Sequence, residues 1–467
     1  MKKTLCIFLS IVSLMMCGCA VSGQAHIDSG NQKLSEVKQW ELLSEAYRYV
    51  FPLMMMNQTM KTATNVECPD LSGHAPIGQL IHAQRLADAN AKMVVTPNVD
   101  TVYTQAWLDL SEEPMVLIMP PTDRYFQTQV LDAWTNTPAV LESGNYLIAR
   151  AGYKGEVPEK LKIVEVPTDM VWMISRILTN GSEDMVKVKE IQNAMVLMPL
   201  SSYLSDEKYI PKKGEHKDKY DGVPVNAVLG MSPQDYFSTA NELMLKNPPS
   251  ERDASILEKF AVLNIGPGKQ FDAAVLKGDV QRNWNALRSS LKEIVYREGV
   301  KYQKTIGDWS YFGEPIGNFR DAYDYRAMIA LSGLGANPME VAVYLKTGVD
   351  SEKSTLNGRN DYVLHFDSLP PACAGGFWSV TAYGSDDFLI ANELNRYCIN
   401  DRTGLRLNED GTLDVILSNQ APENTKNWLP VGEDDFHLVM RIYLPDMNAI
   451  GNGWISPTIT KTPRRKP

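Results

Sequence analysis

Two stretches of alternating polarity constrain the fold more than any other feature of the chain. In residues 98–110, NVDTVYTQAWLDL, most even positions are apolar, and the odd positions carry aromatic and polar groups. In residues 436–444, FHLVMRIYL, Phe, Leu, Met and Ile alternate with His, Val, Arg and Tyr. Successive side chains of a β-strand point to opposite faces. Both stretches therefore predict antiparallel strands with one face on a core and the other exposed to solvent.

Helical patterns occupy two other parts of the chain. Apolar residues recur at helical spacing in residues 35–51, and Pro52 predicts that this helix stops or kinks there. Residues 232–300 carry further amphipathic helices, the first with Ser232 as its cap. Strand patterns are expected to return from about residue 323. The chain is therefore expected to be an α+β protein, mainly β, with an N-terminal helix and a helical insert.

One sequence echo links the two β regions. MPPTDRYFQTQVLDAW, near Met119, and LPPACAGGFWSVTAY, near Leu369, share two prolines, then an aromatic pair, then a β run that ends in an aromatic residue. A real repeat of this kind would mean two related β-sandwich domains on either side of the helical insert.

The first twenty residues resemble the signal of a bacterial lipoprotein. Lys2 and Lys3 precede an apolar run that is shorter than the roughly 20 residues needed to span a bilayer, and Gly18 stands before Cys19. The resemblance implies cleavage before Cys19 and lipid attachment to it. It also implies an outer-membrane location in a cell with two membranes, because Ala20 is not the Asp typical of inner-membrane retention. Ordinary secretion is the alternative.

Charge and cysteine content limit the partners. The formal charge of −10 becomes −12 once the two lysines of the signal are removed, and this acidity argues against a nucleic-acid partner. The segment 206–222 mixes both signs, which is typical of a solvated loop. Of the three cysteines beyond the signal, Cys373 and Cys398 are candidates for one bridge, although their spacing fixes no geometry. No motif indicates a metal or a cofactor, and none is expected.

Longer motifs resemble the bacterial domain-of-unknown-function families 1254 and 1214, which commonly occur in one chain. The matching pieces include TPNVDTVYTQAWLDL at 96–110, PTDRYFQTQVLDAWTN at 121–136 and GFWSVTAYGSDDFLIANELNRYCI at 376–399. One departure is EAYRYVFPL, where Val50 occupies a position that is more often Gly in the family. The resemblance implies two jelly-roll-like antiparallel β-sandwich domains with helices packed around them, and it implies no assigned reaction.

These patterns divide the chain into six expected segments. They are a lipoprotein signal peptide at 1–18, a flexible tether at 19–34, an N-terminal helix plus β domain resembling family 1254 at 35–200, a charged loop and helical insert at 201–322, a C-terminal β-sandwich domain resembling family 1214 at 323–450, and a tail at 451–467.

The first candidate ligand site lies on the polar face of residues 98–110. Tyr103 and Trp107 offer aromatic rings, and Asn98 and Asp100 precede them with an amide and a carboxylate. Such a face suits a sugar ring or another amphipathic ligand, because the rings pack apolar surface and the polar groups orient hydroxyls. The alternative is structural: Asn98 and Asp100 form a turn, and the aromatic residues pack under a neighbouring helix.

Other candidates combine charged residues near strands. Arg124 and Asp132 either pair with each other, or Arg124 binds a ligand carboxylate. Arg396 and Arg441 belong to the polar positions of the C-terminal β region and are further candidates for ligand binding.

A histidine held by a carboxylate is the arrangement that a general base needs. His365 with Asp367, and His437 on the polar face of its strand, are therefore the catalytic candidates, with simple solvation as the alternative.

No motif in the chain names a reaction. The leading hypothesis is a lipid-anchored protein of the cell envelope that binds a small molecule or glycan in a cleft near the N-terminal domain. One alternative is an envelope hydrolase that uses carboxylates and a histidine. The other is a structural or oligomer-forming surface protein, in which the exposed aromatic residues are contacts between subunits.

Overall fold

The computed structural model describes residues 34–463, except 93–94 and 206. The predicted signal peptide, Cys19 and nearly all of the predicted tether lie outside the described residues. The residues from Glu36 onward form one compact unit. Helix and strand are nearly balanced, at 28% and 27%, so the expectation of a mainly β protein was wrong.

The N-terminal helix is confirmed as α1 (Glu36–Ala63), and it continues through Pro52 for another three turns. A proline inside a helix removes one backbone hydrogen bond. Tertiary packing offsets that loss, because every residue from Tyr49 to Gln58 is buried. A helix surrounded by protein along such a length has its conformation fixed by its neighbours rather than by local propensity.

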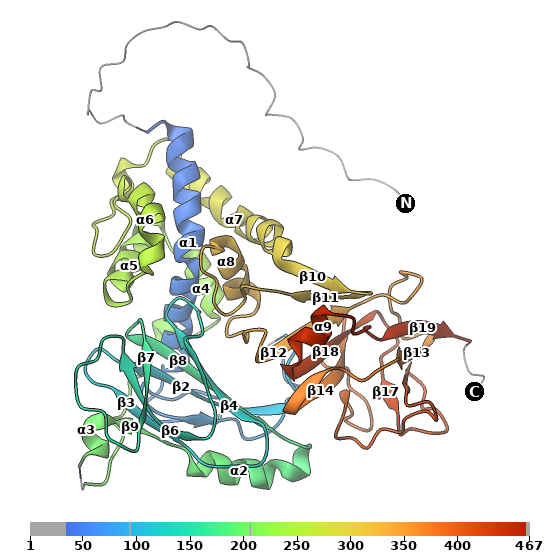
Figure 1. The fold of residues 1–467 in the computed structure, drawn as a ribbon. Helices are drawn as coiled ribbons and strands as arrows, with labels where there is room; N and C mark the ends of the chain where they lie inside the picture. Colours follow the sequence, from blue (N-terminus) through green and yellow to red (C-terminus); the bar gives the residue numbers. More distant parts are fainter. Residues whose placement is uncertain (1–33, 93–94, 206, 464–467) are drawn as a thin grey trace, which may run out of the picture. The chain divides into compact units, whose positions relative to one another are not determined.

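Five helices pack against α1, which passes between α5 and α6 on one side and α7 and α8 on the other (Figure 1). The helices of this layer are α4 (Pro224–Gly230), α5 (Pro233–Lys246), α6 (Ala254–Ala261), α7 (Val280–Gly299) and α8 (Tyr323–Ser332). The predicted cap is present, since the Ser232 hydroxyl accepts a hydrogen bond from the Asp235 amide. Strands were expected from about residue 323, but residues 323–332 are helical. Their sequence, YDYRAMIALS, shows no alternation, and the residues from Tyr325 to Ala330 are buried without interruption.

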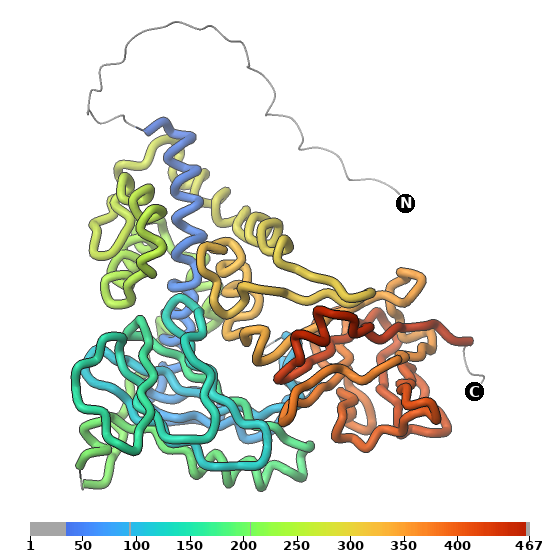
Figure 2. The backbone as a smooth tube through the Cα atoms, in the orientation of Figure 1, coloured from blue at the N-terminus to red at the C-terminus, as the bar shows by residue number. Residues whose placement is uncertain are grey.

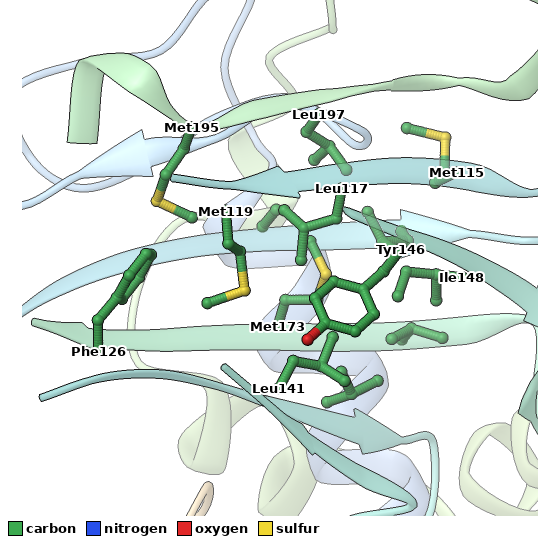
Figure 3. Packing of buried hydrophobic residues seen from close by; sticks show 14 of the residues in the cluster. Met115, Leu117, Met119, Phe126, Leu141, Tyr146, Ile148, Met173, Met195 and Leu197 are labelled. Carbon is green, nitrogen blue, oxygen red and sulfur yellow. The ribbon is translucent and has the colours of Figure 1, made fainter. Parts of the chain in front are cut away.

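Two β units flank this layer, each built from two sheets. In the first unit a five-stranded sheet has the order β1-β2-β8-β4-β5, and a four-stranded sheet has the order β7-β6-β3-β9. Their bounds are β1 (Ile81–His82), β2 (Thr101–Asp109), β3 (Met115–Met119), β4 (Phe126–Asp132), β5 (Ala139–Leu141), β6 (Gly144–Arg150), β7 (Lys162–Val166), β8 (Met170–Leu178) and β9 (Val196–Pro199). Side chains from both sheets form one core, and Met119, Phe126 and Tyr146 are among them (Figure 3).

The second β unit has a six-stranded sheet, β10-β11-β12-β18-β14-β15, and a four-stranded sheet, β17-β16-β13-β19. Their bounds are β10 (Gln303–Ile306), β11 (Trp309–Phe312), β12 (Ala342–Thr347), β13 (Asp361–Phe366), β14 (Ala372–Gly384), β15 (Cys398–Asn400), β16 (Leu413–Ser418), β17 (Trp428–Pro430), β18 (Phe436–Pro445) and β19 (Thr458–Thr462). The two sheets meet through aromatic contacts such as Phe366 with Trp378.

The two β units share one topology. Strands β2 to β9 and strands β12 to β19 occupy equivalent places in the same chain order, so that β2-β8-β4 corresponds to β12-β18-β14. Even the exceptions agree, because β6–β7 and β16–β17 are parallel pairs, which makes both four-stranded sheets mixed rather than wholly antiparallel. The two prolines of the echo lie between β3 and β4 in the first unit and directly before β14 in the second, and β4 and β14 are equivalent strands. The jelly-roll character of these units stays a prediction.

Short elements complete the fold, and the backbone can be followed from blue to red in Figure 2. They are α2 (Met185–Ala194), α3 (Leu200–Tyr203), α9 (Met447–Gly451) and single 3-10 turns at Ser182–Asp184, Asp218–Tyr220, Glu251–Asp253, Ala273–Val275 and Val300–Tyr302.

Candidate functional site

A cavity of about 1340 Å³ lies between the two β units. Its walls come from β2 and β8 of the first unit, from β12 and β18 of the second, from α7 and α8, and from the segments 83–92, 95–98 and 333–337. Exposed lining residues such as Lys92 and Lys346 show that the cavity opens to solvent. Its volume is above the 300–1,000 Å³ usual for small-molecule sites.

The first β unit contributes a row of three cross-strand neighbours. Tyr103 on β2 lies opposite Arg176 on β8, which lies opposite Gln127 on β4. Arg176 is 6% exposed; one terminal nitrogen donates to Gln129 Oε1 at 2.9 Å and the other to the Gly335 carbonyl at 3.0 Å. Its Nε has no hydrogen-bond partner in the described structure.

The turn that holds Arg176 requires a glycine. Gly335 has φ of +84°, and a Cβ there would approach Ile174 Cδ1 to 2.9 Å. A side chain there would be strained by the positive φ and would press on the Ile174 and Trp172 side chains of β8.

The second β unit contributes the equivalent row. Tyr344 on β12 lies opposite Arg441 on β18, which lies opposite Ser379 on β14. Arg441 is 3% exposed, and its Nη2 donates to the Thr96 carbonyl at 3.0 Å and to the Tyr383 hydroxyl at 2.9 Å. Each row therefore presents one tyrosine and one buried arginine to the same cavity.

Asn98 ties the two units together at the cavity wall. Its amide oxygen accepts the backbone N–H groups of Asp100 and Thr101, which fixes the orientation of the side chain. Its Nδ2 then donates to the Tyr443 hydroxyl at 2.6 Å and to the Tyr103 hydroxyl at 3.2 Å. Both hydroxyls act as acceptors in these bonds and keep their own protons for donation.

The lining is strongly cationic although the chain is acidic. Burial raises the pKa of the Tyr344 hydroxyl, so it stays protonated at neutral pH. Among the described lining residues, two are acidic, Asp88 and Asp387, and seven are basic: Arg85, Lys92, Arg176, Arg288, Lys292, Lys346 and Arg441. Apolar and aromatic side chains, among them Trp172, Ile174 and Phe312, supply the rest of the wall.

Three of the sequence candidates line this cavity: Asn98, Tyr103 and Arg441. Trp107 does not line it, because its ring stacks on Trp172 with centroids 4.9 Å apart and is 4% exposed. Asp100 is fully buried and bonds Arg402 and Ser379 across the two β units.

The remaining ligand candidates make contacts within the chain. Arg124 pairs with Asp184 at 2.6 Å rather than with Asp132. Asp132 instead accepts the backbone N–H groups of Trp134 and Asn136, and Arg396 donates to the Trp428 carbonyl.

The histidine candidates lie outside the cavity lining. His365 Nδ1 lies 2.6 Å from Asp414 Oδ1, and its Nε2 lies 3.4 Å from Asp367. The hydrogen bond to Asp414 raises the His365 pKa. His437 stacks on Tyr383, and burial lowers its pKa to about 4.

The expectation that the second faces of residues 98–110 and 436–444 are solvent-exposed was wrong. Along 436–444 this face is buried, including His437 and Arg441, and along 98–110 it is buried or half-buried as far as Trp107. The sequence left open whether Cys373 and Cys398 form a bridge, and both are free.

Sequence reasoning missed Arg176, Tyr344 and Asn337. Arg176 sits in MVWMISRIL, where the apolar run concealed it. Two sequence similarities could have revealed the arginine and the tyrosine. ISRIL on β8 resembles VMRIYL on the equivalent strand β18, and TVYT on β2 resembles AVYL on the equivalent strand β12.

The segment 206–222 is exposed over most of its described length. Ligand atoms of His216, Asp218 and Asp221 there lie within 4.8 Å of one another, at an exposed position. In the part of the chain that the structure describes, no helix is both long and apolar enough to cross a bilayer.

Two segments of the chain match known protein families. Residues 77–199 match DUF1254, described as a protein of unknown function. Residues 341–447 match DUF1214, which carries the same description. The DUF1254 segment contains Tyr103 and Arg176, and the DUF1214 segment contains Tyr344 and Arg441, so each matched segment supplies one row of the cavity.

One solved structure shows the same fold. The VPA0106 protein from Vibrio parahaemolyticus is 23% identical, with a TM-score of 0.68, over 91% of this chain and 100% of that one. A putative uncharacterized protein from Burkholderia cenocepacia is 12% identical, with a TM-score of 0.42, over 91% of this chain and 94% of that one. A search of curated proteins finds no match.

Proposed function

We propose that this protein binds a small amphipathic molecule in the cavity between its two β units. The observation that carries the proposal is the cavity itself, which has room for a ligand and combines apolar walls with hydrogen-bonding groups from both units. Tyr103, Tyr344 and Asn98 orient the polar part of the ligand, and Trp172 packs against its apolar part.

The assembly alternative has less support. It relied on Tyr103 and Trp107 as contacts between subunits, but Trp107 is buried within one chain and Tyr103 faces the cavity. The hydrolase alternative relied on His365 and His437, neither of which lines the cavity.

Thermal unfolding in the presence of sugars, organic acids and cell-wall fragments tests the proposal, because a ligand that binds the native state alone raises the unfolding temperature. The rim variant Ser332→Trp is expected to abolish any shift by filling the mouth of the cavity. Ser111→Trp, at an exposed position outside the lining, is the matched control and should keep the shift. No shift with any compound, or a shift that Ser332→Trp leaves intact, would contradict the proposal.

We further propose that the chain is lipid-anchored to the cell envelope through Cys19, with the outer membrane as its location. The lysines, the apolar run and Gly18-Cys19 of the sequence support this. Metabolic labelling with a fatty acid should mark the wild-type chain and leave Cys19→Ala unlabelled. Labelling of Cys19→Ala at the wild-type level would refute the assignment.

A further inference from the structure

The two arginines of the cavity are buried, and no carboxylate of the described residues lies within ion-pair distance of either one. Arg176 and Arg441 are 6% and 3% exposed, and neither forms an ion pair in the described part of the chain. The buried carboxylate of Asp100 acts on Arg441 only from beyond that distance, where its charge helps to raise the Arg441 pKa. Buried charges in proteins are normally paired, because removing a charge from water is costly. An anion supplied from outside the chain would complete this site.

Hydrogen-bond donors also exceed acceptors around the two arginines. Arg176 Nε has no partner, and the hydroxyls of Tyr103 and Tyr344 accept amide hydrogens while their own protons have no assigned acceptor. Asn337 Oδ1 is unpartnered as well. Turning that amide around would give the Tyr344 proton an acceptor but free an N–H donor, so the excess of donors does not depend on the amide orientation.

Tyr344 lies next to residues of both rows. It is the cross-strand neighbour of Arg441. Its hydroxyl accepts a hydrogen bond from Asn337, two residues beyond the Gly335 carbonyl that Arg176 contacts. The positive charges of both arginines also act on this hydroxyl and oppose the rise of its pKa on burial. An acceptor bound there is therefore stabilised by both guanidinium groups.

We infer that the ligand is an organic anion, a carboxylate or a phosphate monoester with an apolar body. Its acid group binds at the Tyr344 hydroxyl, between Arg176 and Arg441. This inference rests on the proposed function and adds the chemical class of the ligand. Guanidinium groups match the oxygens of both acids. Trp172, Ile174 and Phe312 receive the apolar body.

A matched series of octyl compounds tests the inference by calorimetric titration of the protein that begins after Cys19. Octanoate and octyl phosphate carry the acid group, octanol is neutral and octylamine is cationic. We expect either acid to bind at least about tenfold more tightly than octanol, since hydrogen bonds to charged groups contribute about 1.5–3 kcal/mol. Octylamine should bind more weakly than octanol. Comparison of the two acids identifies the preferred head group.

Substitutions locate the acid group. Tyr344→Phe keeps the ring and removes one donor, and Arg176→Gln and Arg441→Gln remove the charges. Each should weaken binding of the preferred acid about tenfold to a hundredfold and weaken binding of octanol less, because a hydrogen bond to a neutral hydroxyl contributes less than one to a charged group. Arg150→Gln is the control, because Arg150 is half-exposed, pairs with Asp169 and does not line the cavity. If an arginine variant fails to fold, Tyr344→Phe still decides.

The possible failures are distinguishable. Equal binding of octanol and both acids, or acid binding that Tyr344→Phe and the arginine variants leave intact, overturns the inference while the proposed function stands. Binding of neutral compounds from the wider panel without binding of either acid likewise overturns the inference and leaves the proposed function standing. If no compound of any class binds, the proposed function and the inference both fail.

Discussion

The buried pair of Asp100 and Arg402 gives the sharpest test of how the two β units are joined. Asp100 directly precedes β2 and is fully buried, and its Oδ1 accepts a hydrogen bond from Arg402 Nη2 at 3.0 Å. Its Oδ2 accepts the hydroxyl of Ser379 on β14. The Arg402 guanidinium lies 4.6 Å from the centre of the Phe377 ring. One carboxylate thus connects the first unit to two segments of the second.

Asp100→Ala should strongly destabilise the protein. Breaking a buried pair by removal of one partner costs about 3–5 kcal/mol, because the other charge stays buried. Arg402 keeps Asp401 as a second partner, and 17% of its side chain is exposed. The expected loss of stability is therefore at the lower end of this range, about 3 kcal/mol. Asp100→Asn keeps an acceptor for Ser379 and should cost less, about 2 kcal/mol.

Urea unfolding measures these losses from the transition midpoint and slope. The matched control is Asp109→Asn at the other, exposed end of β2, where the expected change is within about 0.5 kcal/mol. The double variant Asp100→Ala with Arg402→Met should lose less than the sum of the single variants, because it leaves no unpaired charge. Single losses no larger than that of Asp109→Asn, or additive losses in the double variant, would refute the reasoning.

Two further predictions follow from the pKa shifts. The unfolded chain protonates His437 near pH 6.5, whereas the folded chain does so only near pH 4, so this residue should remove about 2 kcal/mol of stability as the pH falls from 7 to 5. Urea midpoints at the two pH values should differ less in His437→Gln than in the wild type, and equal differences would contradict the assignment. Burial raises the pKa of Cys398 to about 12, whereas Cys68 and Cys373 are exposed, so iodoacetamide at pH 8 should label two of these thiols in the folded protein. Rapid labelling of Cys398 would show that it is accessible.

Alternation along the chain located strands but not the surroundings of their second faces. Tyr103 and Trp107 were placed correctly on the face opposite the core of the first unit. That face is nevertheless covered, because a segment more than 200 residues away, around Gly335, packs against it. A period-two pattern records which side chains share a face; it carries no information about a covering element supplied by a remote part of the chain.

Local signals were weakest where buried polar residues or a long-range environment decided the structure. Arg176 lies inside an apolar run that fits both strand and helix, and its hydrogen bonds to Gln129 and Gly335 arise only after the chain has folded. Pro52 is a strong local stop signal, and packing of α1 on every side overrides it.

The shared topology explains why the candidate site escapes a search for sequence motifs. Each β unit alone carries one tyrosine beside one buried arginine on the central strands of its larger sheet. Neither row contains a carboxylate partner, so either arginine alone would be a costly buried charge. Packing of the two units brings the equivalent residues Tyr103 and Tyr344, and Arg176 and Arg441, to one cavity. The tyrosine and arginine of one row are therefore more than a hundred residues away from those of the other row. The length of the helical insert, rather than the chemistry of the site, sets this spacing. A protein with two such β units and an insert of different length would keep the same four side chains at different sequence spacings. Such a site is therefore found from equivalent strand positions and not from a local sequence motif.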